Sequence, residues 1–137
     1  MILFKKDKLT TTDIGHYGEE VAAKFLKKQG YRILERNFRA GRNEIDIIAE
    51  NREFLVFVEV KARSGVGTYE YDYGTPATAV THAKRRRTVE AARAYLYKNR
   101  TDKEPRFDVI EVYLGQSAYT LSPEVLKIEH LCDAFRN

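Results

Sequence analysis

The stretch Asn43–Arg63, NEIDIIAENREFLVFVEVKAR, decides the fold. It holds two apolar runs, Glu44–Ala49 and Phe54–Ala62, with polar residues between them, and this pattern predicts a β-hairpin. The second run is rich in valine and phenylalanine, which is typical of a central strand buried on both faces. We therefore expect the hairpin to lie at the centre of a sheet whose two faces are covered by other elements.

Three charged residues, Asp46, Glu59 and Lys61, lie inside these apolar runs, where an unpaired charge is costly. Side chains alternate along a strand, so Glu59 and Lys61 share one face. A two-residue turn at positions 51–52 would place Asp46 diagonal to Glu59, and a turn at positions 52–53 would place it directly opposite. Both registers bring the two carboxylates to the same face.

Carboxylates that face each other across a sheet repel unless a cation lies between them. Oxygen ligands with no cysteine nearby favour Mg²⁺ or Mn²⁺ over zinc, and such an ion activates water for phosphodiester hydrolysis. Lys61 could orient the attacking water or stabilise the pentavalent phosphate, and Glu44 lies on the strand face of Asp46 as an auxiliary group. The alternative is that Asp46, Glu59 and Lys61 form a buried ion-pair network without chemistry.

A helix is expected before the hairpin, over residues 14–29, with a cap at Thr12 or Asp13 and a stop at Gly30. On a helical wheel Glu19 projects at the edge of the apolar stripe, whereas Glu20 projects among lysines at the surface. Only Glu19 is placed to face the hairpin and to complete the ligand set of a metal.

The remaining chain predicts an α/β fold with a mixed central sheet in α-β-β-β-α-β order. A strand over Tyr31–Phe38 precedes the hairpin, and a glycine-rich loop follows it over Ser64–Pro76. A helix over Ala77–Asn99 crosses to a strand over Phe107–Leu114, which predicts that this strand pairs in parallel with the sheet. The tail, LKIEHLCDAF, is expected to form a short strand and a terminal helical turn.

The length of 137 residues fits one domain, assigned to residues 13–137 after a flexible basic segment at residues 1–12. No apolar run approaches the roughly 20 residues of a membrane helix. The apolar run at the N-terminus is too short for a signal peptide. A single cysteine, Cys132, excludes a disulfide framework and a cysteine-based zinc site, and it is expected in the core. A cytoplasmic protein without a membrane partner is expected.

The basic residues are grouped rather than scattered, with a net charge of +4. Lys84, Arg85, Arg86 and Arg87 are consecutive, which fits contacts to nucleic-acid phosphates or, alternatively, a solvated helix face. Tyr69 and Tyr71 lie in the loop, where they could stack on unpaired bases or pack on the sheet. Asp108 interrupts the last long strand, and it is interpreted as a partner of Arg106, a support for the site or a strand-end charge.

Several segments in the same order resemble one known family. They are GHYGEEVAAKFL, GYRILERNFR, EIDIIAE, LVFVEVKAR, RFDVIEV and KIEHLCDAF, between about residues 15 and 135. With these segments the chain resembles the uncharacterised bacterial YraN-like family. That family is similar in turn to archaeal Holliday-junction resolvases and to the PD-(D/E)XK nuclease superfamily, which has a restriction-endonuclease-like core.

The resemblance implies an endonuclease that hydrolyses DNA, at branched or junction structures, and acts as a homodimer. It implies that Asp46, Glu59 and Glu19 bind the metal and that Lys61 is the catalytic lysine. One departure is Asn43, which stands where the family has glycine before Glu-Ile-Asp. Two other functions stay open, a non-catalytic nucleic-acid-binding module of the same fold and a protein-interaction domain in DNA processing.

Overall fold

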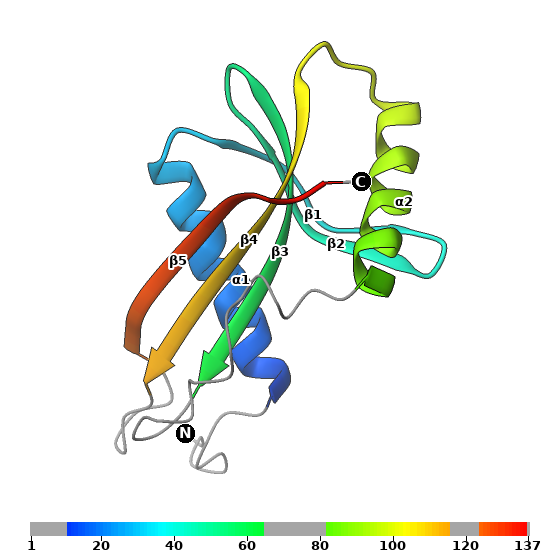
Figure 1. Ribbon diagram of the computed structural model, residues 1–137. Helices are drawn as coiled ribbons and strands as arrows, with labels where there is room; N and C mark the ends of the chain where they lie inside the picture. The colour runs from blue at the N-terminus through cyan, green and yellow to red at the C-terminus, as the bar shows by residue number, and fades with distance from the viewer. Residues whose placement is uncertain (1–10, 65–81, 116–123, 137) are drawn as a thin grey trace, which may run out of the picture.

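Two helices and a five-stranded sheet make up the computed structural model over its described residues, 11–64, 82–115 and 124–136 (Figure 1). In chain order these elements are α1 (Thr11–Lys28), β1 (Arg32–Ala40), β2 (Asn43–Glu50), β3 (Phe54–Ser64), α2 (His82–Lys98), β4 (Glu104–Gly115) and β5 (Glu124–Phe135). The predicted α/β class is confirmed. Neither helix, in these ranges, is both long enough and apolar enough to cross a membrane.

The sheet has the order β1-β2-β3-β4-β5. Strands β3 and β4 pair in parallel, while the other neighbours pair antiparallel. Helix α2 makes the crossover that a parallel pair requires. The mixed sheet and the parallel pair predicted from the sequence are both confirmed.

The two helices cover opposite faces of the sheet, which Figure 1 shows with α1 on one side and α2 on the other. Val56 and Val58 of β3 pack with the α1 core, and Leu55 and Phe57 pack with the α2 core. None of these four residues is more than 2% exposed. The continuous apolar run of β3 is thus explained, because both of its faces are covered.

Helix α1 ends as predicted at Gly30, whose φ is +97°. The amide of Gly30 donates to the Lys27 carbonyl at 3.1 Å and the amide of Tyr31 donates to the Leu26 carbonyl at 3.0 Å. These two bonds form a Schellman motif, for which glycine is the favoured residue. They fix the point at which the chain turns from α1 into β1.

Helix α1 also comes unusually close to β3. A Cβ added to Gly18 would lie only 2.7 Å from the Cβ of Ala62, so only glycine fits at this crossing. The contact lies one residue after Lys61 and one residue before Glu19. It therefore determines where Glu19 sits relative to the hairpin.

Three boundaries predicted from the sequence are wrong. Residues Thr12 and Asp13 lie inside α1 instead of capping it, and β4 begins at Glu104 instead of Phe107. The tail is a single strand to Phe135 without a helical turn. Near its end, Asp133 has a φ of +57° and the register with β4 shifts between Phe107 and Val109, which marks a bulge in the strand.

Candidate active site

The hairpin register places Asp46 beside Glu59. The ladder pairs Ile47 with Val58, so it follows the register of a turn at positions 52–53. Asn51 selects this turn, because its Oδ1 accepts hydrogen bonds from the backbone amides of positions 53 and 54, at 3.0 and 2.8 Å. One step beyond the last pair of the ladder, Asp46 lies across from Glu59.

Asp46 occupies the point at which the two strands separate. Its carboxylate accepts a 2.8 Å hydrogen bond from the amide of Val60, where a backbone carbonyl would continue the ladder. Burial, and after it the charge of Glu59, raises the pKa of Asp46 to about 7. The Val60 hydrogen bond opposes this shift but does not cancel it. The site thus disfavours two ionised carboxylates in the absence of further positive charge.

Two lysines supply positive charge to Glu59, whose side chain is 12% exposed. The Lys84 ammonium of α2 lies 3.1 Å from Glu59 Oε2, and the Lys61 ammonium of β3 lies 3.9 Å from the same atom. Lys61 is therefore on the face of Glu59, as the alternation predicted. Lys84 belongs to the run assigned to nucleic-acid contacts, and the structure places it in the carboxylate site.

Glu19 is half-buried and Glu20 is exposed, as the helical wheel indicated. Burial raises the pKa of Glu19, and the nearby carboxylate of Glu44 adds to the effect. With its amide nitrogen turned toward them, Asn37 donates to Glu19 at 3.2 Å and to Glu44 at 3.3 Å. The charge of Glu19 also contributes to the raised pKa of Asp46. Glu19 and Glu44 thus form an acidic group joined electrostatically to Asp46.

The carboxylates of Glu19, Asp46 and Glu59 do not converge tightly. Within the described ranges, the one group with three ligand atoms inside 4.8 Å of one another is Asp108, His130 and Cys132. The predicted set would need side-chain rotation to close around one ion. Its donors are all carboxylate oxygens, and two of them repel each other, so the chemistry of the set fits Mg²⁺ or Mn²⁺.

The rest of the basic run is divided among different surroundings. Arg85 lies over the ring of Phe135, with 5.5 Å between its Cζ and the ring centroid. Arg86 and Arg87 are exposed. Only these last two are fully presented to a polymer at the surface, so the four residues do not act as one patch. Tyr69 and Tyr71 lie outside the described residues.

The sequence reasoning missed a buried network on the α1 face of the sheet. Asp108 is fully buried and accepts from Arg106 at 2.9 and 2.8 Å, from the amide of Asp133 at 2.8 Å, and lies 2.7 Å from His130 Nε2. The predicted pairing with Arg106 is confirmed. Burial alone would raise the pKa of Asp108, but these hydrogen bonds hold it below its usual value. Since Asp108 and His130 are far apart in sequence, no local pattern signals the contact.

The prediction that Cys132 lies in the core is wrong, because Cys132 is exposed on the edge strand β5. Its Sγ lies 3.6 Å from His130 Nε2, the same nitrogen that faces Asp108. A relay from thiol to carboxylate needs two different ring nitrogens, so this group does not form a catalytic triad. Burial raises the pKa of the Cys132 thiol, which also opposes nucleophilic chemistry.

A second missed residue is Glu111, which pairs in register with Lys61 and is 1% exposed. Its Oε2 accepts from Arg63 Nε at 2.9 Å, while its Oε1 has no hydrogen-bond partner. In the sequence, the one indication of a role for Glu111 is Lys61 on the neighbouring parallel strand, because residues paired in a ladder place their side chains on the same face of the sheet.

The comparisons with known proteins point to one family. The sequence model of the uncharacterised protein family UPF0102 matches residues 18–112. A UPF0102 protein of Caldanaerobacter subterraneus subsp. tengcongensis is 40% identical over 93% of this chain and 98% of its own length. A UPF0102 protein of Clostridium botulinum strain Loch Maree is 44% identical over 84% and 91%, and one of Flavobacterium psychrophilum is 42% identical over 90% and 93%.

Proposed function

The chain belongs to the YraN-like family UPF0102, and we propose that it is a divalent-metal-dependent nuclease that hydrolyses DNA phosphodiester bonds. The observation that carries the proposal is the meeting of Asp46 and Glu59 where β2 and β3 separate, with Lys61 beside them. A structural ion pair would match each carboxylate with its own cation. Here burial, and after it the charge of Glu59, raises the pKa of Asp46 to about 7, and the charge of Lys84 does not offset them.

Asp46 and Glu59 would hold the cation, and Glu19 would join them from α1. When bound, Mg²⁺ or Mn²⁺ supplies Lewis-acid activation of water and neutralises charge on the phosphate. The Val60 amide fixes one oxygen of Asp46, which leaves the other oxygen to bind. This backbone contact holds the carboxylate in position before substrate arrives.

The two lysines have separate tasks in this proposal. Lys61 lies on β3, where its ammonium is near Glu59 and its neighbour in the ladder with β4 is Glu111. From this position the ammonium orients the attacking water. Lys84 comes from α2 and contacts Glu59 at 3.1 Å. If Glu59 held a cation, the Lys84 ammonium would lose this contact and would instead stabilise the negative charge of a bound phosphate.

The test is cleavage of branched and linear DNA with Mg²⁺ or Mn²⁺. Asp46→Asn and Lys61→Ala should each reduce the rate by at least about a hundredfold, the usual cost of losing a group that acts at the reacting centre. Lys28→Ala, which removes an exposed charge from α1, serves as the control and should keep the rate within a few-fold. No cleavage of any DNA by the wild type would refute the proposal.

Glu19 and Glu20 offer a matched pair for the metal itself. Calorimetric titration with Mn²⁺ should show weaker binding for Glu19→Gln, because that carboxylate acts on Asp46, and wild-type binding for its exposed neighbour Glu20→Gln. Equal effects of the two substitutions on Mn²⁺ binding would show that Glu19 is not a metal ligand.

One observation favours a second function, a nucleic-acid-binding module without cleavage. Lys84 already neutralises Glu59 at 3.1 Å, so the site as it stands can be a closed ion-pair network. The module predicts DNA binding that is indifferent to Mg²⁺ and unchanged in Asp46→Asn. The nuclease predicts calorimetric Mn²⁺ binding that Asp46→Asn abolishes.

A further inference from the structure

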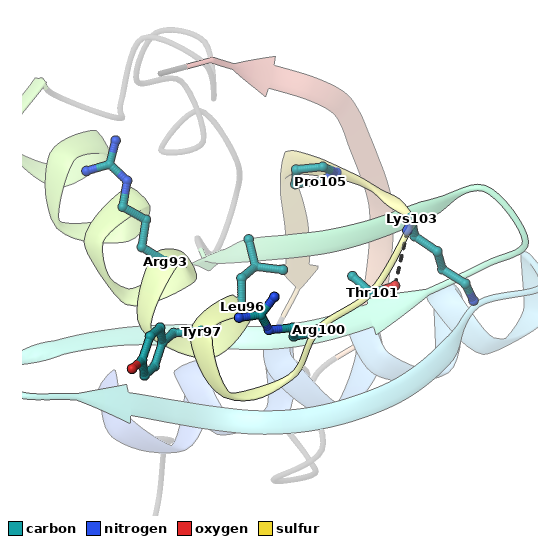
Figure 2. Close-up of a pocket in the computed structure, with 7 residues that line it drawn as sticks. All are labelled: Arg93, Leu96, Tyr97, Arg100, Thr101, Lys103 and Pro105. Atoms are coloured by element: carbon teal, nitrogen blue, oxygen red, sulfur yellow. Dashed lines mark hydrogen bonds between the residues drawn. The ribbon is translucent and has the colours of Figure 1, made fainter.

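A pocket of about 480 Å³ lies at the C-terminal end of α2, the opposite end of the helix from Lys84. The residues that line it belong to the last turns of α2 and to the segment that enters β4, and Figure 2 labels them; among them are Arg93, Leu96, Tyr97, Arg100, Lys103 and Pro105. Its volume is in the range of small-ligand sites, about 300 to 1,000 Å³. The nuclease proposal does not use this pocket.

Three cationic side chains give the pocket a positive charge. Arg93 contacts the exposed carboxylate of Glu90 at 3.4 Å, and Lys103 contacts Glu50 at 3.1 Å. Arg100 is exposed and makes no ion pair with any carboxylate of the described residues. The pocket therefore has at least one guanidinium available for an anion, and Arg93 contributes a second because its exposed pair is weak.

The pocket also presents an aromatic ring to solvent. Tyr97 is 81% exposed, the highest value among the large hydrophobic side chains of the described residues. Figure 2 shows its ring projecting from the last turns of the helix. A ring this exposed adds nothing to the core, and its face can take a flat partner. Arginine beside an exposed aromatic ring is the combination that binds a nucleotide, phosphate to guanidinium and base to ring.

An exposed stripe runs along α2 from the pocket toward the end of the helix that carries Lys84. Arg86, Glu90, Arg93 and Tyr97 recur at spacings of four, three and four, and all are exposed. The thirteen residue steps from Lys84 to Tyr97 rise about 20 Å along the helix. At about 3.4 Å per step this corresponds to roughly six base-pair steps of a duplex.

We propose that this pocket binds the phosphate and stacks the base of an unpaired nucleotide, about six steps from the phosphodiester bond that is cut. This inference rests on the proposed function, because it takes DNA as the ligand. Arg93 and Arg100 contact the phosphate, Tyr97 stacks on the base, and the exposed face of α2 carries the strand between pocket and carboxylates. The substrate is thereby a DNA with a single-stranded segment next to a duplex.

The chain contains no tryptophan, which makes a direct test available. Tyr97→Trp places a single tryptophan in the pocket, and a stacked base should quench its fluorescence. The probe is a DNA duplex with a single-stranded overhang, compared with the same DNA whose overhang is abasic. Asp46→Asn is included in the same chain so that binding is measured without cleavage.

Saturable quenching by the overhang with bases, and not by the abasic one, supports the proposal. Binding without quenching, or equal quenching by both DNAs, overturns it. The outcome is separate from that of the nuclease assay: quenching without cleavage by the wild type refutes the nuclease alone, while cleavage without quenching refutes the pocket alone.

Affinity measurements with the same overhang DNA give an independent test. Tyr97→Ala should weaken binding about tenfold, the loss of one base stack, and Tyr97→Phe should bind as the wild type does. Glu90→Gln should tighten binding, since it removes the carboxylate of the stripe. Arg100→Ala should weaken binding more than Lys28→Ala, the control that removes one charge from α1 on the other face of the sheet. Equal losses for these two variants would leave only a general charge effect and would refute the subsite.

Discussion

Replacing Asp46 by asparagine should make the protein more stable at alkaline pH. The pKa of Asp46 in the fold is about 7, against 3.8 for an ordinary aspartate. Between these two values the folded protein holds a proton that the unfolded chain has lost, so the free energy of unfolding falls as pH rises through this window. The asparagine of the variant carries no charge, and its amide oxygen can still accept from Val60.

The raised pKa gives the size of the effect. A rise from 3.8 to about 7 corresponds to about 4 kcal/mol. Because Asp46 is only half-buried, solvent screens part of this penalty and we expect about 2 kcal/mol. At a pH of about 8.5 the variant should therefore be more stable than the wild type by that amount, and near a pH of about 3, where Asp46 is protonated in both the folded and the unfolded chain, the two should be almost equal.

Urea unfolding followed by circular dichroism measures both values. A matched experiment with Mg²⁺ tests the cause: at the alkaline pH the ion should raise the stability of the wild type and have little effect on the variant, which lacks the Asp46 carboxylate that the ion requires. A variant that is less stable at the alkaline pH, or a difference independent of pH, would refute the raised pKa.

Two further substitutions test the parts of the fold that hold the site. Gly18→Ala should lower the free energy of unfolding by about 1 to 3 kcal/mol because its Cβ would meet Ala62 at 2.7 Å, and Ala62→Gly should restore part of the loss; no restoration in a double-mutant cycle would disprove the contact. Asp108→Asn should cost about 3 to 5 kcal/mol near neutral pH, since it leaves Arg106 without its buried partner, whereas Asp102→Asn in the exposed turn should cost less than about 0.5 kcal/mol. Since the pKa of Asp108 is lowered, its contribution is present above pH 3.8 and is lost as pH falls through the folded-state value, so the two proteins should converge in acid.

The α/β class, the hairpin and the parallel pair could be predicted from the sequence because each follows from local periodicity and from the length of the crossover. The choice between the two hairpin registers could not, because it depends on the side chain of Asn51 accepting from two backbone amides. Alternation alone reduces the choice to these two. That was still sufficient to bring Asp46 to the face of Glu59.

Other features could not be predicted because they depend on how distant segments are arranged in the fold. Lys84 reads as part of a basic run, but the crossover brings it from α2 to Glu59. Arg106, Asp108 and Tyr31 join across as many as 75 positions, and no local pattern indicates such a network. Cys132 reads as a small core residue, yet it lies exposed on a strand at the edge of the sheet.

The parallel pairing of β3 with β4 has a consequence for folding kinetics. It joins Phe54 to Glu104 and so closes a long loop, whereas β1, β2 and β3 meet their partners within short stretches of chain. Contacts between near neighbours form faster than contacts that close long loops. We expect Asp46 and Glu59 to meet early, before α2 delivers Lys84, so that the two carboxylates first face each other in an intermediate that a divalent cation would stabilise.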